Sequence, residues 1–523
     1  MKRFLRQHAD QIRGVLSGFD RLRFRGTLRW LAYPAGMRSF LSCLGVFLKD
    51  FKTYVQGVTD QIRDAAEQLA RAEGRRVIYL NSSAISKEEL AREIAQRDGI
   101  GEGLVCVFSA VEPCFSYELH RNRESRLLEL RGRPQKCLHY YFYFQDRKFG
   151  FMHVRLQTWF PLTVHVAING REWLSRQLDA AGIGYRRYDN CFLEVADLGQ
   201  AQQLGNSQLA TRWQAVFNQL VERVHPTHRQ IVYHGEPVAY YWSLEQSEWA
   251  TDIMFRSPAD LAELYPHLLR RGLHDFSSPE VMRFLGRKTP LHGGVNGNFA
   301  GDVVSDVARR ADHLRIKHRL DRNWIKMYDK QGSVLRVETT LNDVRGMKVF
   351  RHAEGDPAGT RCWRSLRKGV ADVRRRAHLS DAANKRYLDA LADVEATEPL
   401  AKLTEAICRP TQWNGKRVRA LQPWSPLDAG LLAAVHRPEF TLQGFRNRDL
   451  RPLLFGPGQV SPQETRRQSA KITRQLRMLR AHGLILKVPH THRYQLTARG
   501  QKILAALQAA HQANAEQLAK LAA

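Results

Sequence analysis

The last hundred residues constrain the fold most strongly, because a cationic amphipathic pattern there runs into two short apolar segments. Arg467, Lys471 and Arg474 recur every three or four residues and therefore share one face of a helix. Apolar side chains within 472–479 follow the same spacing on the roughly opposite face. Residues 483–500 begin with a glycine typical of a helix C-cap and continue as two short apolar runs flanking a polar tip. The pattern predicts a basic helix followed by a β-hairpin wing.

The charge of this segment indicates its partner. Nine Lys or Arg and a single acidic residue lie between Glu464 and Arg499. Solvated surface helices usually interleave both signs, so a helix of cations alone indicates a polyanion as partner. We therefore predict a DNA-binding winged helix. Its expected duplex contacts, in or beside the major groove and at the wing tip, are Arg467, Lys471, Arg474, Arg477 and Arg493.

The same segment resembles the winged helix-turn-helix of MarR-type regulators. The matching parts are 440–450 as the entering helix, 466–481 as the recognition helix, and 482–500 as the wing. The resemblance covers about 110 of the 523 residues. It implies a DNA-binding module without implying the biology of that family, because winged helices also serve replication initiators, transposases and RNA-binding proteins.

The composition of the whole chain supports a nucleic-acid partner. The 523 residues suffice for two to four domains, and 43% hydrophobic with 25% charged residues is typical of globular proteins. The formal net charge is +29, and from residue 401 onward twenty Lys or Arg face six Asp or Glu. Such a field favours phosphate backbones. No segment has the length or pattern of a membrane span or signal peptide, and seven cysteines without CxxC spacing indicate a reducing cytoplasm.

The periodicities predict a multidomain α/β and α+β protein. We expect helices over most of residues 1–75, interrupted by a strand near 18–28 in which Leu22 and Phe24 alternate with arginines. An apolar strand at 103–111, a β-meander at 136–168 and three further strands at 314–342 follow. The expected divisions are an N-terminal α/β region (1–130), a β-meander with a helix (131–205), a central α+β region (206–360), a basic helical connector (361–408) and the winged-helix domain (409–523).

The central strands carry one candidate site. Residues 325–340 read as a hairpin in which Lys326, Tyr328, Arg336 and Glu338 share a surface if the turn has the right parity. This run resembles the strand pair of rolling-circle replication initiators. The resemblance implies Tyr328 as a nucleophile toward a DNA phosphate and Glu338 as a ligand of a divalent cation. The paired histidines of that family's metal motif are absent from the sequence. The alternative is a β-surface that binds phosphate through Lys326 and Arg336 or pairs its own charges.

Other carboxylates are candidate ligands for Mg²⁺ or Mn²⁺. Glu248 and Asp252 are four residues apart, which places them on the same side of either a strand or a helix. Asp20 and Glu112 lie on or just after predicted strands, where nuclease folds of the RNase H type place metal ligands. With Glu338 they would form a catalytic metal site if they converge. The alternative for each is a structural cap or a salt bridge with arginine.

Two functions remain open from the sequence. The first is a DNA-binding protein of a mobile-element or plasmid type, which recognises a site through the winged helix and cleaves or nicks DNA with Mg²⁺ or Mn²⁺. The second is a non-catalytic protein without a cofactor, either a transcriptional regulator or an RNA-binding protein. In both, we expect the basic helical stretch 361–376, including Arg374, Arg375 and Arg376, to contact nucleic acid non-specifically.

Overall fold

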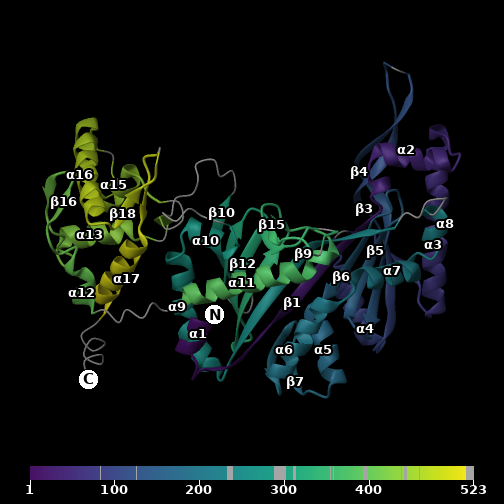
Figure 1. The fold of residues 1–523 in the computed structure, drawn as a ribbon, viewed down its shortest axis with the longest axis horizontal. Helices are drawn as coiled ribbons and strands as arrows, with labels where there is room; N and C mark the ends of the chain where they lie inside the picture. Colours follow the sequence, from purple (N-terminus) through teal and green to yellow (C-terminus); the bar gives the residue numbers. More distant parts are fainter. Residues whose placement is uncertain are drawn as a thin grey trace. The chain divides into compact units, whose positions relative to one another are not determined.

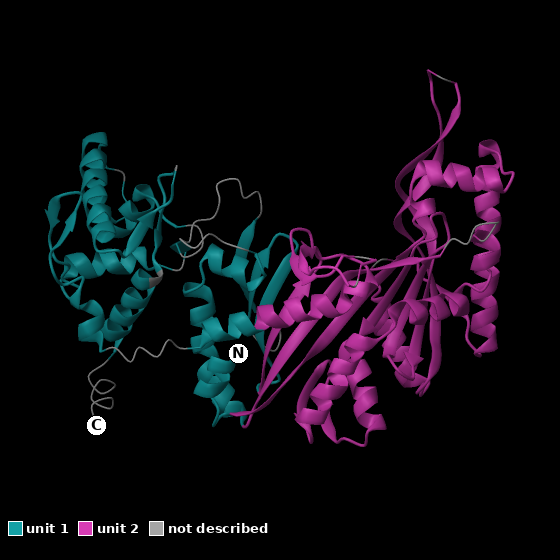
Figure 2. Ribbon diagram, viewed as in Figure 1, with its two compact units in different colours: residues 1–11, 257–332, 385–523 teal, residues 12–256, 333–384 magenta. Residues whose placement is uncertain are grey.

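The structure is a computed structural model that describes residues 1–82, 84–124, 126–232, 239–287, 302–309, 314–353, 355–356, 358–392, 399–437, 439–440, 444–456, 458, 460–489 and 491–513. The chain forms two compact units, each assembled from segments far apart in sequence (Figure 2). Unit 2 comprises residues 12–256 and 333–384, and unit 1 comprises residues 1–11, 257–332 and 385–523. Both units mix helices and strands, as the sequence predicts at the level of fold class.

Unit 2 is built on a mixed sheet with the strand order β13-β9-β1-β6-β5-β4-β3-β2. Its strands are β1 (Ile12–Thr27), β2 (Val77–Tyr79), β3 (Gly103–Arg121), β4 (Leu128–Asp146), β5 (Gly150–Gln157), β6 (Val164–Asn169), β9 (Tyr241–Phe255) and β13 (Val334–Leu341). Neighbouring strands are antiparallel except β2 and β3, which are parallel. The predicted apolar strand and meander are therefore confirmed, as parts of one sheet.

Strand β1 corrects the prediction for the N-terminal region. Residues 12–17 were expected to be helical, but they open a 16-residue strand that pairs with β9 along its length and with β6 at its end. Leu16 and Phe19 are buried in the main core. The tertiary pairing on both sides outweighs the local helical pattern in this segment.

Helices cover both faces of this sheet. The helices of unit 2 are α2 (Pro34–Cys43), α3 (Phe51–Ala72), α4 (Lys87–Arg97), α5 (Gly170–Ala180), α6 (Leu198–Ser207), α7 (Trp213–Val224), α8 (His228–Val232) and most of α11 (Val373–Leu391). Helix α11 runs across the sheet beside β9 (Figure 1), where Asn384 donates to the carbonyls of Trp249 and Val337. Helix α5 approaches the opposite face so closely that a Cβ on Gly170 would collide with the Phe19 carbonyl.

Two hairpins complete unit 2. The hairpin of β7 (Tyr185–Tyr188) and β8 (Cys191–Val195) follows α5, and a second hairpin joins β14 (Lys348–Arg351) to β15 (Cys362–Ser365). The second hairpin overturns the prediction of one basic helix from residue 361 onward. Residues 362–365 pair with β14 as a strand, and the helix α11 begins only at Val373.

Unit 1 contains three antiparallel strands with their helices, and the C-terminal module. Its first part comprises α1 (Lys2–Gln7), α9 (Pro258–His274), α10 (Ser278–Phe284) and the antiparallel strands β10 (Val303–Arg309), β11 (Leu314–Leu320) and β12 (Asn323–Lys330). The predicted turn after β12 is present, with Gln331 and Gly332 both at positive φ. The strand β10 was not predicted.

The C-terminal module is a separate cluster of helices with a two-stranded wing. Its elements are α12 (Leu400–Glu405), β16 (Thr411–Trp413), β17 (Lys416–Val418), α13 (Pro426–Val435), α15 (Asn447–Phe455), α16 (Pro462–Ala481), β18 (Ile485–Lys487), β19 (Tyr494–Leu496) and α17 (Ala498–Gln512). Ile472, Leu476 and Leu479 are buried in its core, as the helical spacing predicts. The hairpin β18–β19 is antiparallel, and Gly483 precedes it at φ +70°.

The entering helix of this module differs from the prediction. It was expected over 440–450, whereas α15 begins at Asn447 and continues to Phe455. Residues 441–443 and the wing-tip residue His490 lie outside the described residues. Asn447 donates to the Ser469 carbonyl and so joins α15 to α16.

Across the described helices of the chain, none combines the length and apolar character needed to cross a bilayer.

Candidate metal site and nucleic-acid surface

Three neighbouring strands of unit 2 bring acidic side chains to one face of the sheet. Asp252 of β9 lies opposite Arg336 of β13, and Glu248 lies opposite Thr340 in the same strand pair. Residues two apart in a strand share a face, so Arg336, Glu338 and Thr340 face the same side as Glu248 and Asp252. The sheet therefore brings together carboxylates that lie far apart in the sequence.

A β-bulge adds Asp20 to this face. Phe19 lies opposite Trp249 and Leu22 lies opposite Ser247, so two residues of β1, Asp20 and Arg21, occupy the space of one residue of β9. Bulges of this kind redirect side chains and are common beside active sites. Phe19 and Leu22 both face the core, which leaves Asp20 on the side of Glu248.

We call Asp20, Glu248 and Glu338 the carboxylate cluster. One carboxylate oxygen from each lies within 4.8 Å of the others. All three side chains are buried, and Glu248 is the most exposed at 8%. Burial raises the pKa of Asp20 above its ordinary value of 3.8, and the nearby charge of Glu338 raises it further, against the opposing effect of Arg336. Three carboxylates in this environment are electrostatically costly unless a cation joins them.

Asp252, which the sequence nominated as a metal ligand, has a different role. Its two oxygens accept hydrogen bonds from Nε and Nη2 of Arg336 at 2.6 and 3.0 Å, and Arg171 of α5 lies 2.9 Å away. Asp252 is thus clamped between two buried guanidinium groups, and Asp20 replaces it in the carboxylate cluster. The prediction of Asp252 as a metal ligand is therefore corrected, because its oxygens are already bonded to Arg336.

Arg336 was predicted to contact nucleic acid, but it is fully buried within this network. Besides its two bonds to Asp252, it donates to Asp20 at 3.1 Å and to the Asn190 carbonyl at 2.6 Å. Asn190 in the β7–β8 hairpin also donates to Asp20 at 2.6 Å. Arg336 therefore fixes the position of Asp20 and is not available to a ligand.

A row of arginines adjoins the carboxylate cluster on the same face of β1. Arg21, Arg23 and Arg25 alternate with the buried Leu22 and Phe24, as the sequence predicts. Arg21 and Arg23 are exposed, and we call the three arginines the cationic row. Burial lowers the pKa of Arg21, but Glu248, Asp20 and Glu338 outweigh it and raise the pKa overall, which shows how near the row lies to the cluster.

Strand β6 and its neighbour continue this surface. Arg25 lies opposite His165 of β6, which in turn lies opposite Arg155 of β5. Glu245 is 3.4 Å from Arg25 and 3.6 Å from His165, and the Arg25 and Glu245 side chains are 37% and 40% exposed. Burial lowers the pKa of His165 to about 3, so this histidine is neutral and the positive charge of this part of the face comes from its arginines.

Glu112 does not join the carboxylate cluster. It accepts from the Tyr141 hydroxyl at 2.5 Å and pairs with Lys87 at 2.9 Å and Arg155 at 3.0 Å. Burial would raise its pKa, but these partners together lower it. Glu112 therefore has the structural role, a salt bridge with arginine, that the sequence analysis gave as the alternative to metal binding.

Tyr328 and Lys326 belong to unit 1, on β12. Tyr328 is 8% exposed and lies opposite Arg315 of β11. Lys326 is half-buried, lies opposite Lys317, and places its ammonium 5.8 Å from the ring of Trp324. The carboxylate cluster is complete from residues of unit 2 without either side chain.

The basic helix α16 presents its cations as predicted. Arg467, Lys471, Arg474 and Arg477 are all exposed, and Arg467 lies 3.7 Å from Glu464. Lys471 lies 5.5 Å from the ring of Phe455. Arg493 of the wing is half-buried and donates to the Gly444 carbonyl at 3.5 Å.

The arginine triplet of α11 corrects another prediction. Arg374 is exposed, but Arg375 pairs with Asp372 at 2.6 Å. Arg376 is buried and donates to Ser247, to the Leu244 carbonyl and to the Leu341 carbonyl. It ties α11 to β9 and β13, so it is structural and not a nucleic-acid contact.

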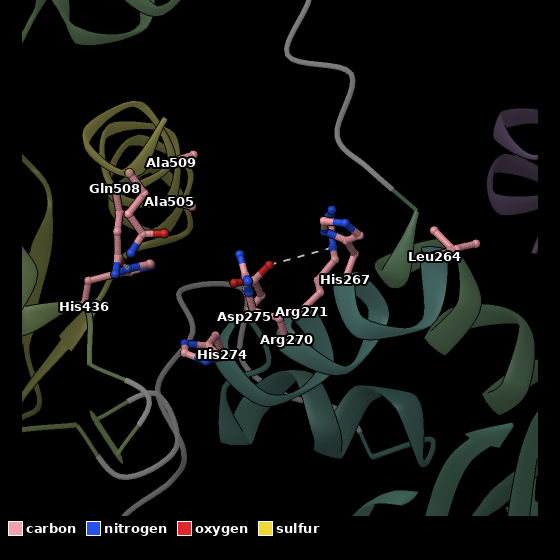
Figure 3. A pocket seen from close by; sticks show the side chains of 11 residues that line it. Leu264, His267, Arg270, Arg271, His274, Asp275, His436, Ala505, Gln508 and Ala509 are labelled. Carbon is pink, nitrogen blue, oxygen red and sulfur yellow. Dashed lines mark hydrogen bonds and ion pairs between the residues drawn. The ribbon is translucent and has the colours of Figure 1, made fainter. Parts of the chain in front are cut away.

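Unit 1 also holds a cavity of about 650 Å³ (Figure 3). Its charged lining is mostly cationic, with Arg270 and Arg271 of α9 among histidines. The lining carboxylate Asp275 lies 3.8 Å from Arg271. The cavity has no acidic set comparable with the carboxylate cluster.

Sequence reasoning missed Arg171 and Asn190 altogether. Both act through tertiary contacts with residues more than 75 positions away, and no local pattern marks them.

Comparison with known proteins gave no match to any family model, curated protein or solved structure.

Proposed function

We propose that this protein is a nucleic-acid-processing enzyme that cleaves or transfers DNA strands at the carboxylate cluster, with Mg²⁺ or Mn²⁺ as cofactor. The observation that carries the proposal is the convergence of Asp20, Glu248 and Glu338 from three neighbouring strands. Carboxylate oxygens are the ligands that these hard cations prefer. Burial is the main cause of the raised pKa of Asp20 and the charge of Glu338 adds to it, so a bound cation would offset both effects.

The donor set fits a divalent cation. Each of the three residues offers an oxygen, and these lie within 4.8 Å of one another. A bound Mg²⁺ or Mn²⁺ would supply Lewis-acid stabilisation of the charge that develops on a phosphoryl oxygen. Arg336 and Asn190 hold the Asp20 carboxylate in place, so the ligand geometry is preorganised by the fold.

The cationic row supplies the substrate side of the proposal. Arg21 and Arg23 are exposed beside the cluster, and guanidinium groups bind phosphate oxygens in a planar, bidentate manner. In this proposal they bind the phosphate backbone and orient the scissile phosphate toward Glu248, the most exposed cluster member. The net charge of +29 would draw the polyanion to this surface.

The C-terminal module is proposed to recognise the DNA site. Its exposed helix α16 and antiparallel wing have the order and charge of a winged helix, and their cations would contact duplex DNA. The resemblance to replication initiators and MarR-type domains implies the same organisation: one region that cleaves DNA and one module that recognises a DNA sequence. On this basis we propose a role for the protein in a mobile element or plasmid.

The direct test is cleavage of supercoiled plasmid by the full chain with Mg²⁺, Mn²⁺ or EDTA. We expect metal-dependent nicking that is lost in Asp20→Asn, Glu248→Gln and Glu338→Gln, with DNA binding retained in EDTA. Glu112→Gln is the matched control, because Glu112 is a salt-bridged carboxylate on the same sheet. Equal cleavage activity in all four variants would contradict the proposal. So would a wild-type protein that cleaves neither DNA nor RNA.

A non-catalytic DNA-binding protein is the second candidate. The observation in its favour is that Asp20 already bonds to Arg336 and Asn190, as a purely structural carboxylate would. The two candidates differ in cation binding. A structural network predicts no thermal stabilisation by Mn²⁺, whereas the catalytic site predicts stabilisation that depends on Glu338.

A further inference from the structure

The hairpin β14–β15 exposes two aromatic side chains directly opposite each other. Phe350 of β14 is the cross-strand partner of Trp363 of β15, and their ring centroids are 5.8 Å apart. Their exposed fractions are 57% and 59%. Large aromatic side chains usually dominate cores and interfaces, so a solvent-facing pair indicates a binding surface. We call this pair and its hairpin the aromatic ribbon.

The ribbon is anchored on its other side. Val349 is buried in a small core with Met347 and Leu366, and Leu341 of β13 belongs to the same cluster. Successive side chains of a strand point to opposite faces, so burial of Val349 sets Phe350 outward. The exposure of the aromatic pair is therefore imposed by a packed hairpin and is not a frayed end.

The charges around the ribbon identify the chemistry of its occupant. Lys348, Arg351, Arg361 and Arg364 make no ion pair with any carboxylate among the described residues. Lys348 is two residues from Phe350 and therefore shares its face. Arg351 and Arg364 are next to the aromatic residues in sequence and so lie on the other face, with Val349. Aromatic rings that share a face with Lys348 match a ligand that combines flat apolar rings with negative charge. Nucleotides have both properties, whereas an apolar protein surface has only one.

We propose that the aromatic ribbon binds single-stranded DNA by stacking unpaired bases on Phe350 and Trp363, with Lys348 on the same face contacting phosphate. Bases of a duplex stack on each other and do not offer a free face, so the ribbon selects unpaired DNA. This inference rests on the proposed function, since it specifies the state of the substrate strand. The ribbon and the carboxylate cluster belong to the same unit. A strand-cleaving enzyme that holds an unpaired strand there would act on opened or displaced DNA.

The test compares binding of the full chain to fluorescent oligonucleotides in EDTA, where no metal-dependent cleavage occurs. The variants are the double variant Phe350→Leu with Trp363→Leu, which retains apolar bulk and removes both aromatic faces, and the single variant Trp363→Phe, which keeps an aromatic ring at both positions. The matched control is Phe47→Leu, at an aromatic side chain that is 69% exposed elsewhere on unit 2. Circular dichroism and thermal unfolding check that each variant is folded.

We expect the double variant to bind a single-stranded oligonucleotide about ten- to one-hundred-fold more weakly. Its binding to a blunt duplex should be unchanged, and Phe47→Leu should match the wild type. Trp363→Phe should keep most of the wild-type affinity, because both positions still carry an aromatic ring. An oligonucleotide with abasic positions should bind the wild type as weakly as it binds the double variant, because it has phosphates without bases.

Three results would overturn the inference. The first is an unchanged affinity of the folded double variant for single-stranded DNA. This includes the case in which the substitutions change only the self-association of the protein. The second is an equal loss for duplex and single strand, and the third is tighter binding of an RNA strand of the same sequence. Failure of the proposed function is recognised separately. Loss of binding in the double variant, with no plasmid cleavage by the wild type, would support the ribbon and reject the enzyme.

Discussion

Replacement of Glu338 by glutamine should make the protein more stable, because it removes one of three like charges from a buried cluster. The cluster oxygens lie within 4.8 Å of one another. At an effective dielectric constant near 20, two unit charges at that distance repel by about 3.5 kcal/mol. Glutamine removes the repulsion toward both Asp20 and Glu248, while Arg336 and Arg21 lose part of their attraction. We expect a net gain of about 1–3 kcal/mol, since the opposing terms largely cancel.

The same variant should change the pH dependence of stability. The pKa of Asp20 is raised in the folded protein above 3.8, so the folded state binds this proton more tightly than the unfolded state. Stability should therefore increase as the pH falls from neutrality through the raised pKa, and the gain should be complete near pH 3.8. Because Glu338 contributes to the shift, Glu338→Gln should flatten this dependence.

The assay is thermal unfolding in EDTA at several pH values, followed by tryptophan fluorescence. A gain of this size corresponds to a rise of about 2–8 °C in the midpoint. Glu112→Gln is the control with the opposite sign, because its lowered pKa means that its charge stabilises the fold. Its midpoint should fall. Mn²⁺ should stabilise the wild type and have little effect on Glu338→Gln. A midpoint that falls in both variants would refute the electrostatic reasoning.

Four further predictions follow from the buried and exposed cations and from Tyr328. Arg336→Ala should lower the free energy of unfolding by about 3–5 kcal/mol in urea titrations, because it leaves buried carboxylates without their partner. Arg376→Ala should cost about 2–4 kcal/mol through its lost buried hydrogen bonds, whereas the exposed Arg374→Ala should change stability by less than about 0.5 kcal/mol. Arg474→Ala should reduce the slope of log binding constant against log salt concentration for duplex DNA by about one unit. An unchanged slope would show that α16 does not contact the DNA backbone. Tyr328→Phe should retain plasmid cleavage, because Tyr328 is buried on β12, and a complete loss with DNA binding intact would restore the tyrosine as nucleophile.

Periodicity determined most of the local structure. The cations and apolar residues of α16 could be assigned to opposite faces because a helix repeats every 3.6 residues, and Ile472 and Leu476 are buried accordingly. The alternation of Arg21 and Arg23 with Leu22 predicted a strand with one cationic face, which β1 has. These predictions succeeded because they depend only on neighbours within one or two turns.

Tertiary pairing decided the rest. Residues 12–17 became a strand because β9 pairs with them, and β9 lies more than 200 positions away in the chain. The carboxylate cluster depends on the order β13-β9-β1 and on the bulge at Asp20, neither of which has a local signature. Asp252 and Glu248 are equivalent by spacing, yet one is clamped by Arg336 and the other remains with Asp20 and Glu338. The sequence determined which residues were chemically able to bind a cation, and only the sheet register decided which of them meet, because contacts between distant strands are set by the packing of the whole unit.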